Sequence, residues 1–594
     1  MKLKIVILSM IFALTISCSN YLNEEIVSGV GYSYLKTASG IEAGVGATYA
    51  SLRWDYSGEN MHAIQELGTD TYMEGQDGGY KPALNRYESS LNSQFSLLYD
   101  FWANYYKGIS RANTVLLSIT DVTGMTDEMK KVRTGEVKFL RSLFYFKLVQ
   151  TFGKVPIVDA SSIEAKTDFK RSSVADVYKL IISDLRDAVA KLTETQTDYG
   201  RATKYAACHL LGSVYLTRAS AVTELRGQQP TDLDSAAIYA DQVITSNKYA
   251  LVSDFKQLWS IDNQKNSEII FAVQYSTNML YNNDLGNKIH LYYTMVYDNK
   301  PGMTRDIENG RPWRRVRPTD FSLFELYDRK NDSRFYKTFK TVWLCNYTGN
   351  IPKWEAKAGF VPSPELLGKP KLKLGDTAIW VTMEKYSAKT KMDSLFASRP
   401  YYYIPRNRQT NAEFPQNYKF YDNKRPSVAE ENGSRDWKLF RLAETYLIAA
   451  EAYGRKGDFD NAVKRLNVVR ERAAYKEGEL KPSEFTKIDG GVSADRTKTT
   501  LPQMLLTKED ITTRLGGKSF VDFMLDERAR EMHGELVRKW DLMRCEKLYE
   551  RVKKYNPEAV NVQPYHQLMP IPQNHIDRLE PAGVIGEEQN PGYY

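Results

Sequence analysis

One stretch of the sequence, from Leu439 to Arg472, repeats an apolar pattern twice within 34 residues. Apolar side chains recur at helical spacing as far as Tyr453, and the pattern starts again at Phe459. Gly454 and Gly457 lie between the two runs, where glycines commonly end helices. The stretch therefore predicts two short antiparallel helices that must bury their apolar faces against further helices.

A length of 34 residues is the period of the tetratricopeptide repeat, whose units are stable only when at least three of them stack. A similar pair is predicted from Tyr205 to Thr217 and from Leu233 to Ile244, where Ala236, Ala237 and Ala240 would allow close packing. Further helical patterns occupy residues 95–116, 137–148 and 174–192. Any antiparallel helix pair gives such a pattern, but the set as a whole predicts a mainly α-helical fold.

The middle of the chain reads differently, because helical periodicity is rare from residue 256 to residue 435. Glu268 to Gln274 reads as a short strand. Proline, glycine, tyrosine and tryptophan punctuate the rest, as at Trp313, Trp380 and Tyr401–Tyr403. This composition predicts an irregular, loop-rich region carrying aromatic side chains and short strands, followed by helices again from residue 436.

The amino terminus has the organisation of an export signal. Lys2 and Lys4 precede an apolar run from Ile5 to Ile16, which suits a secretory signal and is too short to span a bilayer. Cys18 follows small residues at the end of this run, which resembles a bacterial lipobox, although Thr15 stands where leucine is usual. In a lipobox the cysteine is acylated and becomes the mature N-terminus; the alternative is an ordinary signal peptide.

We therefore divide the chain into a lipoprotein signal peptide (1–17), a flexible tether (18–35), an N-terminal helical region (36–255) and a C-terminal region (256–594). The last is loop-rich at 256–435. No later segment is apolar enough to cross a membrane, so lipid on Cys18 would provide the attachment.

Composition argues against several kinds of site. The net charge is +8, but basic and acidic residues are interleaved, so nucleic-acid binding is not expected. The six histidines show no metal-binding spacing, and no phosphate-binding glycine loop is present. Cys208, Cys345 and Cys545 lack the spacing of a zinc site or a disulfide framework, and Cys208 is expected in the core. We predict no cofactor and no metal, although binding of calcium stays open.

Four carboxylates, Glu66, Asp70, Glu74 and Asp77, lie close together in the sequence. A glycosidase needs two carboxyl groups about 5 to 10 Å apart, and a loop of this kind could supply them. A solvated acidic turn or a calcium loop would look the same. With no other catalytic motif present, we predict that the protein is not an enzyme; an anchored hydrolase is the remaining alternative.

Several segments together resemble one family. They are the motif at Cys18, Trp102–Asn113, Ala236–Leu251, Arg441–Tyr453, Asp526–Arg544, Met569–Pro572 and the closing Gln-Asn-Pro-Gly-Tyr. In this order they resemble the SusD/RagB family, the outer-membrane nutrient-binding lipoproteins of Bacteroidetes. The resemblance implies about four tetratricopeptide-like pairs forming an α-superhelical scaffold that supports a loop-rich half. It also implies a partner, a SusC-like TonB-dependent outer-membrane transporter, and a place on the cell exterior.

Two of these segments also have a purely structural interpretation. From Asp526 to Arg544, acidic and basic residues fit pairing at i,i+3 and i,i+4, which predicts a salt-bridge lattice with Trp540 packed beneath it. Trp102 is expected in the core rather than at a binding surface.

Sugar recognition needs exposed aromatic rings beside amide, carboxylate or guanidinium groups on loops. Three segments fit this description: residues 70–80, 281–293 and 311–317. The candidate ligand-binding residues are Asp70, Tyr72, Gln76, Asp77, Tyr80, Asn283, Tyr292, Tyr293, Trp313 and Arg314. Each aromatic ring could instead hold its own loop in place or contact the transporter.

The sequence thus predicts a surface lipoprotein that captures oligosaccharide or polysaccharide and delivers it to a SusC-like transporter. A peptide-binding protein of the RagB kind, or a structural lid of the transporter without a ligand of its own, are the alternatives.

Overall fold

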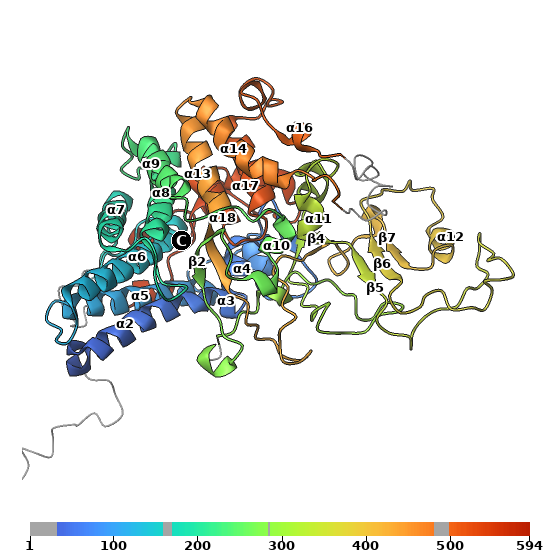
Figure 1. Cartoon of the computed structure of the whole chain (residues 1–594), viewed down its shortest axis with the longest axis horizontal. Coiled ribbons are helices and arrows are strands. Elements are labelled where there is room, and N and C mark those ends of the chain that lie inside the picture. Colours follow the sequence, from blue (N-terminus) through green and yellow to red (C-terminus); the bar gives the residue numbers. More distant parts are fainter. Residues whose placement is uncertain (1–31, 159–168, 283–284, 480–497, 582, 594) are drawn as a thin grey trace, which may run out of the picture.

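The structure, a computed structural model, describes residues 32–158, 169–282, 285–479, 498–581 and 583–593 (Figure 1). The signal peptide, Cys18 and most of the predicted tether lie outside the described residues, as does Asn283. Within the described part of the chain, no helix combines the length and the apolar character needed to cross a membrane.

Helices form the left-hand part of the molecule in Figure 1, where successive pairs lie against each other. Within the described residues there are four such pairs, as predicted. They are α2 (Ala38–Ala50) with α5 (Ser96–Ser118), α6 (Asp127–Phe152) with α7 (Val174–Lys191), α8 (Lys204–Ser220) with α9 (Asp232–Thr245), and α13 (Leu442–Arg455) with α14 (Phe459–Ala473). Successive pairs stack on one another, because α5 packs on α6, α7 on α8 and α9 on α13.

Side-chain caps fix where several of these helices begin. Thr126, Ser173 and Thr203 precede α6, α7 and α8, and each hydroxyl accepts a hydrogen bond of 3.1–3.2 Å from a backbone N–H in the first turn. Such caps satisfy N–H groups that have no partner inside the helix. At the other end of α6, Gly153 has a φ of 71°, which favours glycine and stops the helix.

The predicted helix pair from Leu439 to Arg472 is confirmed, but its two glycines have different roles. Gly457, with a φ of 86°, forms the turn between α13 and α14, and Asp458 caps the second helix. Gly454 lies inside α13 rather than ending it. A Cβ atom there would be 2.0 Å from the ring of Phe520, so this glycine allows α17 (Phe520–Glu531) to approach α13.

The strands are short and scattered through the loop-rich region. The strand predicted from Glu268 to Gln274 is confirmed as β2, which pairs with the strand leading into α13. The sheets are β1 (Tyr72–Glu74) with β3 (Val316–Pro318), β2 (Ile269–Val273) with β9 (Trp437–Arg441), β4 (Phe339–Lys340) with β8 (Gln416–Asn417), and β5 (Val342–Leu344) with β6 (Thr377–Val381) and β7 (Tyr402–Ile404).

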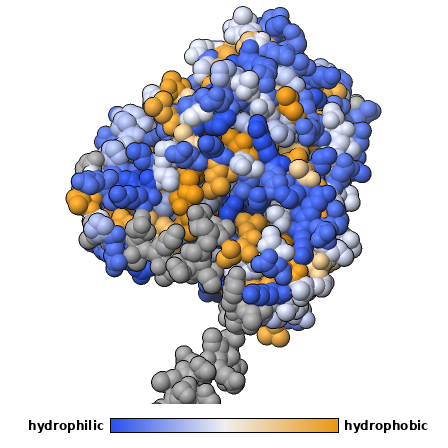
Figure 2. All heavy atoms as spheres, turned by 90° about the vertical axis from the view of Figure 1, so that its left-hand side faces the viewer, coloured by the Kyte–Doolittle hydropathy of each residue, from blue (hydrophilic) through white to orange (hydrophobic). Residues whose placement is uncertain are grey.

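One large core joins the helices to the first part of the loop-rich region, and buried side chains from Leu52 to Tyr593 contribute to it. Trp102 (6% exposed) and Cys208 belong to this core, as predicted. A second, smaller core surrounds Trp343 and Ile379 in the three-stranded sheet, on the right in Figure 1. The surface of the helical end shows hydrophobic residues only in separate groups between hydrophilic ones (Figure 2).

The predicted salt-bridge lattice from Asp526 to Arg544 is present, but most of its pairs do not lie within one helix. Buried Glu531 forms ion pairs with Arg441 at 2.7 Å and Arg334 at 3.1 Å, both from distant parts of the chain. The expectation of pairing along one helix is largely wrong because α17 ends at Glu531, before Glu535 and Arg538. Removing one member of such a buried network leaves an uncompensated charge, so the lattice holds α17 and β9 in a fixed relation.

Trp540, on α18 (Arg538–Arg544), is half-buried beside this lattice, and its indole N–H donates to Thr151 at 3.1 Å.

Candidate functional site

Two of the three predicted ligand segments meet through a short antiparallel sheet. In β1 and β3, Tyr72 pairs with Pro318 and Glu74 with Val316. The pairing continues past the strands, since the N–H of Gly75 donates to Arg315 at 3.0 Å and that of Asp77 to Arg314 at 3.2 Å. Loop 75–80 therefore lies directly beside residues 311–315.

The close approach of loop 75–80 to residues 311–315 restricts the backbone conformation of both. A Cβ atom on Gly75 would be 2.0 Å from the carbonyl oxygen of Arg314, so only glycine permits the two chains to approach this closely. Arg314 itself has a φ of 48°, a left-handed conformation that costs a non-glycine residue about 1–3 kcal/mol. Strain of this kind is common at functional sites, and here it occurs at a residue whose side chain pairs with Asp77 across the junction.

The third predicted segment lies underneath the other two. The N–H of Trp313 donates to the carbonyl of Leu291 at 3.3 Å, and that of Arg315 donates to Tyr292 at 2.9 Å. The ring of Trp313 lies on Tyr292, with 5.8 Å between the centroids. A buried aromatic layer thus supports the tryptophan from below.

Five of the predicted residues remain at the surface, and we call them the Trp313 patch. They are Gln76, Asp77, Tyr80, Trp313 and Arg314. The Arg314 guanidinium forms an ion pair with Asp77, and its Nε lies 3.1 Å from the same carboxylate oxygen. Gln76 is exposed, and the other four are half-buried.

Two further residues belong to this site that the sequence interpretation missed, Glu59 and Arg315. The Arg315 guanidinium lies 4.8 Å from the centroid of the Trp313 ring and forms an ion pair with Glu59. Burial raises the pKa of Glu59, while Arg315 acts in the opposite direction. Arg315 lies within a segment the sequence singled out, but nothing in the sequence connects Glu59 with it.

Burial also raises the pKa of Tyr80, and the charge of Glu59 adds to the effect, so the phenol stays protonated at neutral pH. The main chain of Gly78 lies against the Arg315 side chain, where a Cβ would be 3.4 Å from its Cδ. Loop 76–80 is therefore packed on the Glu59–Arg315 pair rather than free in solvent.

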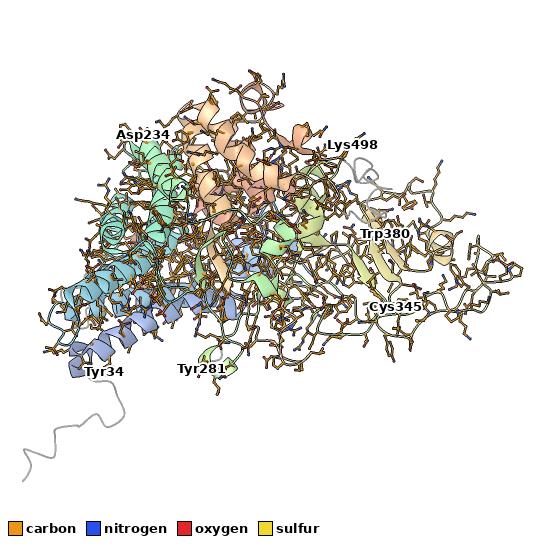
Figure 3. All side chains as sticks on the ribbon, viewed as in Figure 1. Tyr34, Asp234, Tyr281, Cys345, Trp380 and Lys498 are labelled. Atoms are coloured by element: carbon orange, nitrogen blue, oxygen red, sulfur yellow. The ribbon has the colours of Figure 1, made fainter. Side chains whose placement is uncertain are left out.

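The expected exposure is wrong for four of the predicted residues. Asp70, Tyr72 and Tyr292 are 0% exposed and Tyr293 is 2% exposed, so none of them can touch a ligand at the surface of this structure. Other segments cover them, which spacing along the chain does not reveal. Tyr281, from the same segment as Tyr292, is by contrast 69% exposed and projects from the fold (Figure 3).

The buried residues instead support the patch. Asp70 accepts hydrogen bonds from Arg538 at 2.6 and 2.7 Å and from Arg551 at 2.7 Å. Tyr72 accepts one from Asn417 at 2.8 Å, and the hydroxyl of Tyr293 donates to Gly534 at 3.1 Å. The Asp70 contacts bind the segment before β1 to the C-terminal helices, and those of Tyr72 and Tyr293 reach β8 and the turn between α17 and α18.

The four clustered carboxylates, Glu66, Asp70, Glu74 and Asp77, do not point toward a common position at which a substrate could bind. Glu66 is 0% exposed and accepts a hydrogen bond from the N–H of Leu536, and burial raises its pKa to about 8. Glu74 pairs with Arg86 at 2.7 Å. Within the described residues, no group of three or more His, Cys, Asp or Glu side chains could hold a metal ion.

The patch offers an aromatic face bordered by a guanidinium, a carboxylate and an amide. These groups donate and accept hydrogen bonds in fixed directions, while the ring contributes apolar area. A separate groove of about 660 Å³ runs between α2, residues 197–201 and the edge of β2, but none of the predicted residues lines it.

Comparison with known proteins identifies the family. A family model described as the SusD family matches residues 257–593, more than half of the chain. This chain belongs to the SusD family. A second model, described as starch-binding associating with outer membrane, matches residues 69–216, and the predicted resemblance is thereby confirmed.

Individual relatives of this SusD-family chain are distant. SusD-like protein P25 of Formosa agariphila is 22% identical over 583 residues, covering 95% of this chain and 90% of the relative. The starch-binding protein SusD of Bacteroides thetaiotaomicron is 33% identical over 156 residues, covering 25% of this chain and 26% of its own length.

Solved structures confirm the fold. A SusD homolog from Bacteroides thetaiotaomicron superposes with a TM-score of 0.67 at 21% identity, covering 95% of this chain and 98% of the homolog. A structure described as a laminarin binding SusD-like protein has a TM-score of 0.61 at 22% identity, covering 94% of this chain and all of its own. At these identities the likeness establishes the α-helical fold alone.

Proposed function

We propose that this protein is a cell-surface lipoprotein that captures oligosaccharide at the Trp313 patch and delivers it to a SusC-like TonB-dependent transporter. The observation that carries the proposal is the half-exposed ring of Trp313, which lies on buried Tyr292 and beside Arg314. A family that includes proteins named for binding starch and laminarin supports glycan as the ligand class.

The physical basis is a match between the patch and a pyranose ring. One face of a pyranose carries C–H groups that pack on an aromatic ring, and its edge carries hydroxyl groups that need hydrogen-bond partners. Trp313 supplies the ring, while Gln76, Asp77 and Arg314 supply acceptors and donors close by. Because Tyr292 and Arg315 hold the indole in place, little side-chain entropy is lost when the ligand binds.

The remaining parts of the proposal concern location and partners. Lipid on Cys18 would hold the protein at the outer membrane, facing the cell exterior, and the transporter would receive the glycan. The protein would act by binding rather than by catalysis. The name of the family model that matches residues 69–216 supports association with the outer membrane.

Trp313→Ala tests the site. Titration calorimetry with laminarin, starch fragments and a set of peptides would first identify a ligand of the wild-type chain. For a glycan that binds, the variant should lose affinity by at least about tenfold, equivalent to about 1.4 kcal/mol. Tyr34→Ala is the matched control, because Tyr34 is also an exposed aromatic (39%) but lies at the start of the helical part (Figure 3) and does not belong to the patch.

Equal melting temperatures for the two variants would show that any loss is local. If the wild-type chain binds peptides but no glycan, the peptide-binding alternative replaces the proposal. If Trp313→Ala and Tyr34→Ala bind the glycan equally well, the patch is not the site.

A further inference from the structure

A second hollow lies in the part of the loop-rich region furthest from the helices, beside β7 and α12 (Met392–Ala397) (Figure 1). We call it the distal pocket. Its volume is about 140 Å³, close to that of an apolar cavity known to hold benzene, so it has room for one six-membered ring. The residues that define it here are Lys371, Phe396, Arg399, Tyr402, Arg408 and Glu413.

Positive charge dominates this pocket. Its one carboxylate, Glu413, forms an ion pair with Lys300, which lies outside the pocket lining. Across the described part of the chain, no carboxylate forms an ion pair with Lys371, Arg399 or Arg408. Lys371 is half-buried, and burial lowers its pKa.

Aromatic rings orient the cations without neutralising them. The Arg399 guanidinium lies 4.3 Å from the centroid of the Tyr403 ring, and that of Arg408 lies 4.9 Å from Phe396. The Nε of Arg399 is buried and has no hydrogen-bond partner among the described residues. The terminal nitrogens of Arg399 donate to the carbonyl of Leu395 at 3.4 Å and to the hydroxyl of Tyr386 at 3.2 Å. The carboxylate of Glu384 is linked to Arg399 only through that Tyr386 hydroxyl, so the cation–π contact fixes the direction of the guanidinium without a direct ion pair.

Lys371 is held in the same way by neutral groups. Its ammonium donates to the carbonyl oxygens of Ala397 at 2.9 Å and Arg399 at 3.1 Å, and lies 4.6 Å from the Trp354 ring centroid. Partly burying a cation without a nearby anion costs free energy, and a bound anion would offset this cost by pairing with the charge. Guanidinium groups match the planar geometry of carboxylates, and hydrogen bonds between opposite charges are about twice as strong as neutral ones.

We propose that the distal pocket is a second glycan subsite that binds an acidic sugar residue, one that carries a carboxylate or a sulfate group. This deepens the proposed function and rests on it, because it assigns acidic glycans as a ligand class. The anionic group would contact Arg399 and Arg408, and the sugar ring would pack on Tyr402. Trp380 lies on β6, the strand next to β7, and its ring centroid is 5.5 Å from that of Tyr401 (Figure 3). It therefore supports the tyrosines beside the pocket from the adjacent strand.

Arg408→Gln tests the proposal with a matched control two residues away. Arg408 is exposed and Arg406 is half-buried, and both lie in the same short helical turn, η8 (Arg406–Arg408). Arg406, however, points to Asp320 at 3.0 Å and does not line the pocket. Arg406→Gln therefore removes the same charge from the same turn without changing the pocket.

The probes are a galacturonate trisaccharide, a sulfated galactose oligosaccharide, a neutral trisaccharide and an acidic tripeptide, titrated into the full chain. At least one acidic sugar should bind about tenfold more tightly than the neutral one, and Arg408→Gln should remove this preference. The neutral sugar should bind both variants within twofold of wild type. Which acidic sugar binds better distinguishes carboxylate from sulfate.

A salt titration of the wild-type chain gives a second measurement that does not depend on any variant. Affinity for the acidic sugar should fall between about 0.05 and 0.5 M NaCl because salt screens the charges, and affinity for the neutral sugar should not. Equal losses for Arg406→Gln and Arg408→Gln, or tighter binding of the tripeptide than of either acidic sugar, would overturn the proposal.

The two proposals fail in different ways. Failure of the Trp313 patch would appear as glycan affinity that Trp313→Ala leaves unchanged. Failure of the distal pocket would appear as acidic-glycan affinity that Arg408→Gln leaves unchanged while Trp313→Ala still reduces it.

Discussion

Asp70 and Asp77 belong to the same loop segment, but only Asp77 reaches the surface. Asp70 is 0% exposed and bound by Arg538 and Arg551, whereas Asp77 pairs with Arg314 at the edge of the patch. The two guanidinium groups outweigh the effect of burial and hold the pKa of Asp70 well below its usual range. Asp70 is therefore a fixed buried anion that joins the patch to the C-terminal helices.

Asp70→Asn should destabilise the protein by about 3–5 kcal/mol, because it leaves two buried guanidinium groups with too little negative charge. Asp77→Asn is the matched control and should cost no more than about 1 kcal/mol, since its ion pair is partly exposed. Urea unfolding of both variants measures the difference. Equal free energies of unfolding for the two variants would contradict the structural role assigned to Asp70.

The loss of stability caused by Asp70→Asn should depend on pH in a defined direction. A carboxyl group whose pKa is lowered in the folded state stabilises the protein above its unfolded pKa, about 3.9, and loses this contribution as the pH falls through the folded value. The difference in stability between wild type and Asp70→Asn should therefore be full at pH 6 and shrink progressively in strong acid.

At the scale of elements, the packing of the helices depends on how closely their backbones approach one another. Gly454 in α13 faces the ring of Phe520 on α17, and a Cβ there would be 2.0 Å from the ring. Gly46 in α2 faces open space, with no heavy atom within 4 Å of the equivalent position. The same substitution should therefore have opposite effects in the two helices.

Gly46→Ala should stabilise the protein by about 0.5–1 kcal/mol, because alanine is the better helix former. Gly454→Ala should destabilise it by about 1–3 kcal/mol, because overpacking outweighs that gain. Phe520→Ala should cost less stability in the Gly454→Ala background than in the wild-type chain, because there it also removes the clash. Thermal unfolding of the single and double variants measures these effects, and destabilisation by both alanines would refute the packing argument.

The sequence predicts elements better than it predicts sites, for a physical reason. A helix that buries one face must repeat apolar residues at its own period, so α8, α9, α13 and α14 could be located from the sequence alone. Exposure of a loop residue depends instead on which distant segment covers it. Tyr292 is buried because residues 311–316 lie over it, and Asp70 because Arg538 and Arg551 reach it from the C-terminal helices.

Part of the candidate site was nevertheless predictable, because aromatic and polar side chains stand next to each other in the sequence of its loops. Gln76, Asp77, Tyr80, Trp313 and Arg314 came from two such loops, and β1 with β3 brings those loops together. Glu59 could not be found in this way, since only the fold places it beside Arg315.

At the scale of the whole molecule, neither proposed binding region lies on the stacked helices: the Trp313 patch is formed by loops that follow β1 and precede β3, and the distal pocket lies beside β7 and α12. In Figure 1, α2, which begins three residues after the predicted tether in the sequence, lies at the lower left, while β7 and α12 lie toward the opposite end of the long axis. A flexible tether would let such a molecule turn about its attachment while staying close to a membrane partner. This arrangement makes the attachment at Cys18 a property that can be tested separately from ligand binding.

Cys18→Ala should move the protein from the membrane fraction to the soluble fraction of cells that lack the transporter, because several acyl chains are needed for a stable anchor and the variant can carry none. Cys345→Ala is the control: this thiol is buried in the distal part of the fold, so the variant should stay with the membrane (Figure 3). Glycan affinity of the released protein should equal that of wild type, since Cys18 precedes every residue of both binding regions. A Cys18→Ala protein that still sediments with membranes would show that something other than lipid on this cysteine holds it there.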